Sequence, residues 1–224
     1  MKKLIKIFGP FFIITSQVFA LAGFGLNLNQ TMFSVDAKTN SIGDFGSYGY
    51  DAFSGGYGLG GYLYIDAIPF VDIDLEFNGF GTNYDYSITI PTGSTTFSVP
   101  YGSLAGYLTL QKKVFKFSIP VLAKTKLTVG AGLNNQWYKS IPNQSDLNAL
   151  GITSSTSTLP SENKLIEYVK DNIDSAIGFH IQTGLQFKIF MLDSFFYYRQ
   201  VFAENVIPDA KGFGSLNLRL GMGF

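Results

Sequence analysis

The last segment of the chain, residues 213–224, constrains its fold more than any other. Its apolar residues share one parity, and its polar residues and glycines share the other: Leu216, Leu218, Leu220, Met222 and Phe224 against Ser215, Asn217, Arg219, Gly221 and Gly223. Successive side chains of a strand point to opposite faces, so a strand with this pattern has one wholly apolar face. A water-soluble domain rarely needs such a row, whereas a strand that faces lipid does.

The composition is consistent with that interpretation. Charged residues make up 14% of the 224 residues and aromatic residues 16%, which is typical of neither an ordinary soluble enzyme nor a disordered chain. The length suits one domain. Without the N-terminal Lys2, Lys3 and Lys6 the charge balance is acidic, so nothing favours nucleic acid as a partner. The absence of cysteine excludes disulfides and thiolate metal sites.

Residues 1–22 have the three parts of a signal peptide. A basic start is followed by an apolar stretch and then by small residues, which predicts cleavage after Ala20 or Ala22. The apolar stretch is shorter than the roughly 20 residues with which a helix spans a bilayer. Residues 23–224 are therefore the predicted mature domain. Because lipid cannot satisfy backbone N–H and C=O groups, a membrane domain without such helices must be a closed β-barrel.

Eight segments alternate in polarity as barrel strands do. They are residues 24–32, 57–66, 71–78, 101–110, 123–138, 177–188, 195–202 and 216–224. The connections at 67–70 and 189–193 are short, and those at 36–56 and 140–174 are long. We therefore predict an all-β fold, an eight-stranded antiparallel up-and-down transmembrane β-barrel with long outer loops and one short loop helix, at 161–173.

Two stretches leave the strand boundaries open. Beyond Gly79 and Gly81 the apolar parity changes, and residues 84–90 are expected to continue above the membrane. Residues 112–122 are expected to connect the fourth strand to the fifth, with a bulge or a register change near Phe115 and Phe117. A ten-stranded barrel would result if residues 84–99 inserted as a hairpin of their own.

The signal peptide, the eight segments and the terminal L-N-L-R-L-G-M-G-F resemble the small bacterial outer-membrane barrels of the OmpA, OmpX and OmpW type. The resemblance implies a location in the bacterial outer membrane, with lipid and the barrel-assembly machinery as partners. Leu220, Met222 and Phe224 match the terminal pattern that this machinery recognises, and so form the predicted assembly signal. A monomer is expected, and no activity is implied.

Charged residues gather on the parity that faces the interior: Asp66, Asp72, Asp74, Glu76, Lys124, Lys126, Lys188, Arg199 and Arg219. An eight-stranded barrel is just wide enough for its own side chains to fill, or to hold one small ligand. Lone buried charges are costly, so we predict a lumen charge network that neutralises itself. Glu76 and Arg219 are the pair expected near mid-barrel.

The sequence offers little chemistry beyond this network. Asp72, Asp74 and Glu76 alternate as in a calcium loop, but the intervening Ile73 and Leu75 favour a strand, so no metal site or cofactor is predicted. His180 is the only histidine, and Gln182, two residues later, is no nucleophile. We expect a non-enzymatic barrel that serves envelope structure or surface interaction through loops 36–56 and 140–174. The alternative is a narrow gated pore or a carrier for a small molecule, with a hydrophobic one among the candidates.

Overall fold

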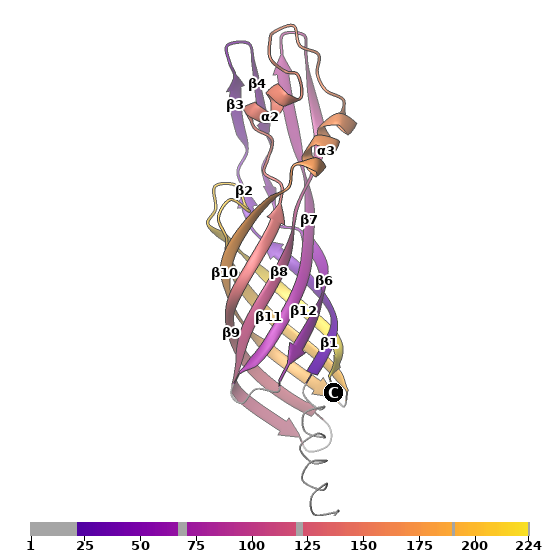
Figure 1. The fold of residues 1–224 in the computed structure, drawn as a ribbon, viewed down its shortest axis with the longest axis vertical. Coiled ribbons are helices and arrows are strands. Elements are labelled where there is room, and N and C mark those ends of the chain that lie inside the picture. The colour runs from indigo at the N-terminus through magenta and orange to yellow at the C-terminus, as the bar shows by residue number, and fades with distance from the viewer. Residues whose placement is uncertain (1–21, 67–70, 120–122, 190, 224) are drawn as a thin grey trace, which may run out of the picture.

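The computed structural model describes residues 22–66, 71–119, 123–189 and 191–223, and it is drawn in Figure 1. The predicted signal peptide up to residue 21, the predicted turn at 67–70 and the terminal Phe224 lie outside these ranges. Among the described residues, every helix is too short or too polar to cross a membrane.

Eight long strands close into a ring. They are β1 (Ala22–Met32), β6 (Tyr57–Ile65), β7 (Asp72–Ile90), β8 (Gly93–Ile119), β9 (Ala123–Tyr138), β10 (Asp174–Ile189), β11 (Leu192–Phe202) and β12 (Gly212–Gly223). The hydrogen-bonded order is β7-β6-β1-β12-β11-β10-β9-β8, and pairing of β7 with β8 closes it. All these pairs are antiparallel. The predicted eight-stranded up-and-down barrel is confirmed.

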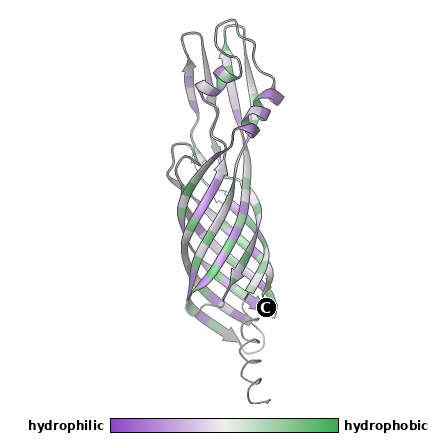
Figure 2. Ribbon diagram, viewed as in Figure 1, coloured by the Kyte–Doolittle hydropathy of each residue, from purple (hydrophilic) through white to green (hydrophobic). Residues whose placement is uncertain are grey.

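The first and last strands, β1 and β12, pair with each other and form the seam of the barrel. β1 and β12 pair with Leu26 opposite Leu220, Asn27 opposite Arg219 and Leu28 opposite Leu218. Paired residues point to the same side of the sheet, so the seam is apolar outside and polar inside. Figure 2 shows the same alternation around the rest of the barrel.

The outer surface of the barrel is apolar on every strand. Ile177 is 82% exposed, Leu26 71% and Leu59 70%, and outward phenylalanines such as Phe77 and Phe115 are more than half exposed. Soluble monomers rarely expose contiguous apolar patches above a few hundred Å². A ring of such side chains is the surface that a membrane-spanning barrel presents to hydrocarbon.

β8 is longer than predicted at its end. Residues 112–119, expected as a connection, belong to the strand, and the predicted irregularity is a register shift between Lys113 and Phe115. A bulge inserts one extra residue. Here it keeps Lys113 on the inner row while Phe115 and Phe117 point outward.

At the other end of the barrel, the chain builds a second compact region, which we call the head (residues 33–56, 82–100, 139–173 and 203–211). It contains β2 (Ser34–Val35), β3 (Lys38–Ile42), β4 (Gly46–Tyr50), β5 (Phe53–Ser54), α2 (Gln144–Ala149), α3 (Glu162–Asp171) and the far ends of β7 and β8. β4 pairs with β7, and β3 pairs with β4. Figure 1 shows the head at the end of the barrel opposite the C-terminus.

The predicted change of parity along β7 does not reflect a change in the direction of its side chains. The two faces of the strand keep their directions, but the kinds of residue on them change. Even-numbered residues point inward along the whole strand, as polar Glu76 does in the barrel and Tyr86 and Ile88 do in the head. The outward residues change from Leu75 and Phe77 to polar ones such as Asp85. About nine to eleven residues of a strand cross a membrane, so roughly 30 Å of β7 extends beyond it. There the surroundings are water, and the apolar side belongs inside.

The head has a hydrophobic core of its own. Ile42, Ile88, Leu147, Leu165 and Ile207 are each at most 1% exposed. α3 lies within the predicted helix 161–173, and it begins at the N-cap Ser161. A second helix, α2, was not predicted; the Asn143 side chain accepts hydrogen bonds from the backbone N–H groups of Ser145 and Asp146 and so caps it.

Hydrogen bonds join the parts of the head. Tyr86 Oη donates to the Pro142 carbonyl over 3.0 Å, and Tyr168 Oη donates to Asp146 Oδ1 over 2.8 Å. Burial raises the pKa of the Tyr86 phenol and so further favours its protonated, donating form. The head is therefore a folded unit and not a set of loose loops.

Candidate functional site

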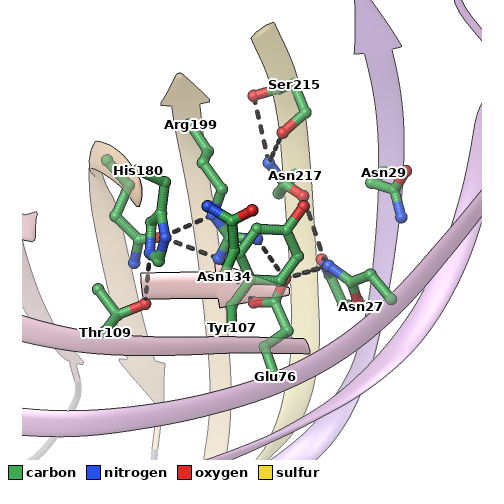
Figure 3. Close-up of polar contacts among 12 residues, drawn as sticks. Asn27, Asn29, Glu76, Tyr107, Thr109, Asn134, His180, Arg199, Ser215 and Asn217 are labelled. Carbon is green, nitrogen blue, oxygen red and sulfur yellow. Dashed lines mark hydrogen bonds and ion pairs between the residues drawn. The ribbon is translucent and has the colours of Figure 1, made fainter. Parts of the chain in front are cut away.

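Glu76 lies at the centre of the barrel interior. β7 aims its side chain inward, and the opposite wall, β11 and β12, aims Arg199 and Arg219 toward it. Arg199 Nη1 lies 2.7 Å from Glu76 Oε1, and Nη2 lies 3.1 Å from Oε2. Figure 3 shows Arg199 reaching across to Glu76. This two-point contact holds both planar groups in one orientation.

Arg219 bridges two carboxylates of the same strand. Its Nη1 lies 2.5 Å from Asp74 Oδ2, and its Nη2 contacts Glu76. Both arginines are 1% exposed, and neither carboxylate is more than 5% exposed. Two guanidinium groups and two carboxylates therefore neutralise each other in a site closed to bulk solvent. The predicted mid-barrel pair, Glu76 and Arg219, is in contact.

Neutral side chains satisfy much of the remaining hydrogen bonding. Tyr197 Oη donates to Glu76 Oε2 over 2.6 Å, and Asn27 Nδ2 donates to Glu76 Oε1 over 3.2 Å. Gln182 accepts from Arg199 Nε at 3.0 Å. The Arg199 guanidinium also lies 3.8 Å from the ring centre of Tyr107, a cation–π distance. In Figure 3 the network continues from Asn27 through Asn217 to Ser215.

A second charged group lies at the short-turn end of the barrel. Lys113 contacts Asp66 and lies 3.2 Å from Asp72, and Lys126 lies 3.4 Å from Asp66. These side chains are only partly buried, at 13–30% exposure. Lys113 was not predicted, because it falls within the stretch expected to be a connection.

Lys124 and Lys188 are not part of either group, although both were predicted to be. Lys124 is exposed and Lys188 is half-buried, and no ion pair involves them among the residues that the structure describes. Both lie within two residues of a strand end, where the lumen opens to solvent. A buried acid that was not predicted, Asp193, accepts from Gln186 Nε2 at 2.9 and 2.8 Å and contacts Tyr64 Oη. It lies in the residues expected to form a turn.

The interior leaves almost no free space near the central cluster. A cavity of about 10 Å³ lies beside Arg199, lined by residues such as Asn29, Asn78 and Ser215. That volume holds a single water molecule at most. Around the central cluster, the interior is filled by side chains of the described residues, as the strand number predicts.

The remaining candidate chemistry has no reactive arrangement around it. His180 is fully buried, its Nε2 lies 2.8 Å from Thr109 Oγ1, and the Tyr107 ring packs against it edge-on. Within residues 22–223, in the parts that are described, no cluster of three or more His, Cys, Asp or Glu side chains could hold a metal ion. Of the predicted assembly signal, Leu220 and Met222 point outward on β12, and Phe224 lies outside the described residues.

No protein-family model and no curated protein matches the chain. Several solved barrels do. One is the outer membrane protein OprG from Pseudomonas aeruginosa, at 11% identity, with 93% of this chain and 98% of that chain covered and a TM-score of 0.43. Another is the N-terminal β-barrel domain of OprF from the same organism, at 13% identity, with 90% of this chain and 99% of that chain covered and a TM-score of 0.42. Ail, the attachment invasion locus protein of Yersinia pestis, also matches, at 10% identity, with 91% of this chain and 97% of that chain covered and a TM-score of 0.37. The barrel assignment rests on the strand register described above, because all three TM-scores are below 0.5.

Proposed function

We propose that the chain is a non-enzymatic barrel of the bacterial outer membrane whose lumen is sealed and whose head is displayed on the cell surface. The observation that carries the proposal is the buried, self-neutralised cluster of Asp74, Glu76, Arg199 and Arg219. It spans the barrel from wall to wall. A cluster of this kind joins opposite strands, and it leaves no route for an ion without first separating a buried pair.

The head supports a role at the surface. In outer-membrane barrels the longer connections face outward, and here they form a folded region with its own core. A cleft of about 510 Å³ opens in the head between the β3–β4 hairpin, residues 138–143 and residues 205–209. Aromatic and charged groups such as Tyr48, Lys38 and Asp174 line it. Rigidly positioned side chains of mixed polarity suit recognition of a partner, because little conformational entropy is lost on binding.

The alternative, a narrow gated pore, has one observation in its favour. Arg219 contacts both Asp74 and Glu76, so its guanidinium could exchange one carboxylate for the other without being left unpaired. A gate of this kind would open only when the two arginines and the two acids re-pair.

Planar-bilayer recordings separate the two functions. A sealed lumen predicts that the purified wild-type chain shows no steady single-channel conductance, because the ion pairs fill the cross-section. Steady openings that Arg219→Glu abolishes would favour the pore. Lys38→Glu is the matched charge reversal, since Lys38 lies in the head and pairs with the exposed Asp209. If Arg219→Glu and Lys38→Glu abolished the openings equally, the loss could not be assigned to the charge cluster in the lumen.

Surface display is tested by labelling single cysteines, since the chain has none of its own. We expect Glu162→Cys, in exposed α3 of the head, to react in intact cells with a maleimide that cannot cross membranes. Lys124→Cys, exposed at the opposite end of the barrel, should react only after the outer membrane is permeabilised. The reverse order of labelling would place the head in the periplasm.

A further inference from the structure

The cleft in the head has walls that are fixed before any partner binds. Two of its three wall segments are anchored by hydroxyl groups of buried tyrosines: Tyr86 Oη donates to the Pro142 carbonyl over 3.0 Å, and Tyr101 Oη donates to the Val206 carbonyl. The volume of the cleft, about 510 Å³, is within the range of about 300–1,000 Å³ that small-molecule sites occupy. A ligand therefore meets a formed site.

Two tyrosine hydroxyl groups of the cleft are available to a ligand. Tyr50 is 9% exposed and Tyr138 is 6% exposed, so both rings are held by packing, and both side chains line the cleft. Neither hydroxyl group bonds to a residue that the structure describes. Both stay open to solvent, unlike the unpaired Tyr62 Oη, which is closed off in the lumen. The rigid rings therefore present polar groups that the described residues leave unsatisfied.

Asp174 adds a carboxylate next to Tyr138. The two residues are direct partners in the pairing of β10 with β9, and both line the cleft. Ser140 Oγ donates to Asp174 Oδ2 over 2.9 Å, which leaves Oδ1 as a free acceptor, and no described cation pairs with this carboxylate. The other carboxylate of the lining, Asp209, already pairs with Lys38 over 3.3 Å. The charged residues that line the cleft therefore leave one negative charge unpaired, at Asp174.

The lumen shows what a carboxylate and a tyrosine hydroxyl group of this chain bind together. There, Arg219 Nη1 lies 2.5 Å from Asp74 Oδ2, and its Nε donates to Tyr197 Oη over 3.1 Å. A guanidinium group has five N–H donors in one plane, so it can bond a carboxylate and a phenol oxygen at once. The cleft has the same two kinds of acceptor in Asp174 and Tyr138, whereas both arginines of the sequence lie in the lumen.

The charge of the head also favours a cationic partner. The head contains ten acidic and five basic residues, a net charge of −5. A surface with an excess of one charge raises the local concentration of oppositely charged ligands and speeds their association. This attraction acts over the whole head and not only at the cleft. It therefore favours a partner that carries positive charge on several residues.

We propose that the cleft binds an arginine side chain of a basic polypeptide, whose guanidinium group donates to Asp174 Oδ1 and Tyr138 Oη. Arginine fits better than lysine because its planar group can bond both acceptors in a fixed geometry, whereas an ammonium group is a compact point charge. This inference deepens the proposed function and rests on display of the head at the cell surface, where such a polypeptide can reach it. The labelling experiment described above tests that display separately.

Peptide binding to the full chain in phosphatidylcholine nanodiscs tests the proposal. The probes are short peptides that carry a neutral fluorescent dye and differ only at one central position, flanked by lysines, which is arginine, citrulline or glutamate. Citrulline keeps the shape of arginine without its charge. Fluorescence anisotropy is measured at low ionic strength, where charges are weakly screened. We expect the arginine peptide to bind roughly ten-fold more tightly than the citrulline peptide, the factor that one hydrogen bond to a charged group gives.

Two substitutions change the charge of the cleft in opposite directions. Asp174→Asn keeps the acceptor for Ser140 and should weaken binding of the arginine peptide roughly ten-fold, to the level of the citrulline peptide. Lys38→Gln frees Asp209 and should tighten binding roughly three-fold, as expected for an exposed charge pair. Asp85→Asn is the matched control: it removes an exposed acid of the head outside the cleft and should keep the ten-fold preference.

Equal binding of the arginine and citrulline peptides by the wild-type chain would overturn the proposal, and so would a preference for arginine that survives Asp174→Asn. Tighter binding of the glutamate peptide than of the arginine peptide would also overturn it and would make the occupant an anion. These results concern the cleft alone, because binding in nanodiscs does not depend on which side of the membrane the head occupies. Labelling of Glu162→Cys only after permeabilisation would instead contradict surface display.

Discussion

Glu76→Ala lowers the free energy of unfolding of the barrel by about 3–5 kcal/mol, the usual cost of removing one partner from a buried ion pair. The substitution takes an acceptor away from Arg199, Arg219, Tyr197 and Asn27 at once. Among the described residues, the remaining carboxylate in contact with either buried guanidinium group is then Asp74, which pairs with Arg219. The loss is measured by urea unfolding in lipid vesicles, followed by the mobility shift between folded and unfolded barrel on a gel.

Two comparisons make this prediction specific to charge pairing. Asp85→Ala removes a carboxylate from the same strand, but at an exposed position of the head, and should change stability by less than about 0.5 kcal/mol. The double variant Glu76→Leu with Arg199→Met leaves the central cluster neutral, with Arg219 still paired to Asp74. We expect it to be more stable than Glu76→Ala, because apolar replacements of a buried pair are often nearly neutral. If the loss of stability in the double variant equalled the sum of the losses in Glu76→Leu and Arg199→Met alone, the pairing of the two residues would be contradicted.

Much of this site could be predicted from parity alone. Once alternation assigns a face to each strand, Asp74, Glu76, Arg199 and Arg219 must share the lumen, and a barrel of this width brings them within reach. The failures lie at strand ends. Lys113 and Asp193 fall in residues that were expected to be connections, and Lys124 and Lys188 have the inward parity but lie where the lumen meets water. Parity predicts whether a side chain points into the lumen or outward. It does not predict how far the side chain lies from the end of the barrel, because that depends on where each strand ends.

The head was harder to predict, for a different physical reason. The sequence between Tyr84 and Val99 alternates with its apolar residues on the inward side, so it does not match the pattern of a lipid-facing strand. β3 and β4 add to the extended β7, which single-sequence patterns cannot indicate because the pairing partner is distant in the chain. α2 depends on a local signal, the Asn143 cap, that is recognisable only once the surrounding segment is known to be ordered.

Tyr86→Ala should unfold the head while leaving the barrel intact. Tyr86 is fully buried, and its hydroxyl fixes the Pro142 carbonyl at the start of the α2–α3 segment. Removal of a buried aromatic side chain costs about 3–5 kcal/mol. The ring of hydrogen-bonded strands and the charge cluster do not depend on this contact, so the loss should appear as local opening. Protease should then cleave within residues 139–173 of the variant, with an unchanged gel shift of the barrel.

Tyr86→Phe separates the ring from the hydroxyl in the same assay. It keeps the packing and loses one hydrogen bond, so the head should weaken by about 1 kcal/mol and remain largely resistant to protease. If Tyr86→Ala instead abolished the gel shift, head and barrel would unfold as one cooperative unit. The strands make this outcome worth testing, because β7 and β8 run without a break from the charge cluster into the head. Local opening would mean that the change of surroundings from lipid to water divides these continuous strands into two units of stability.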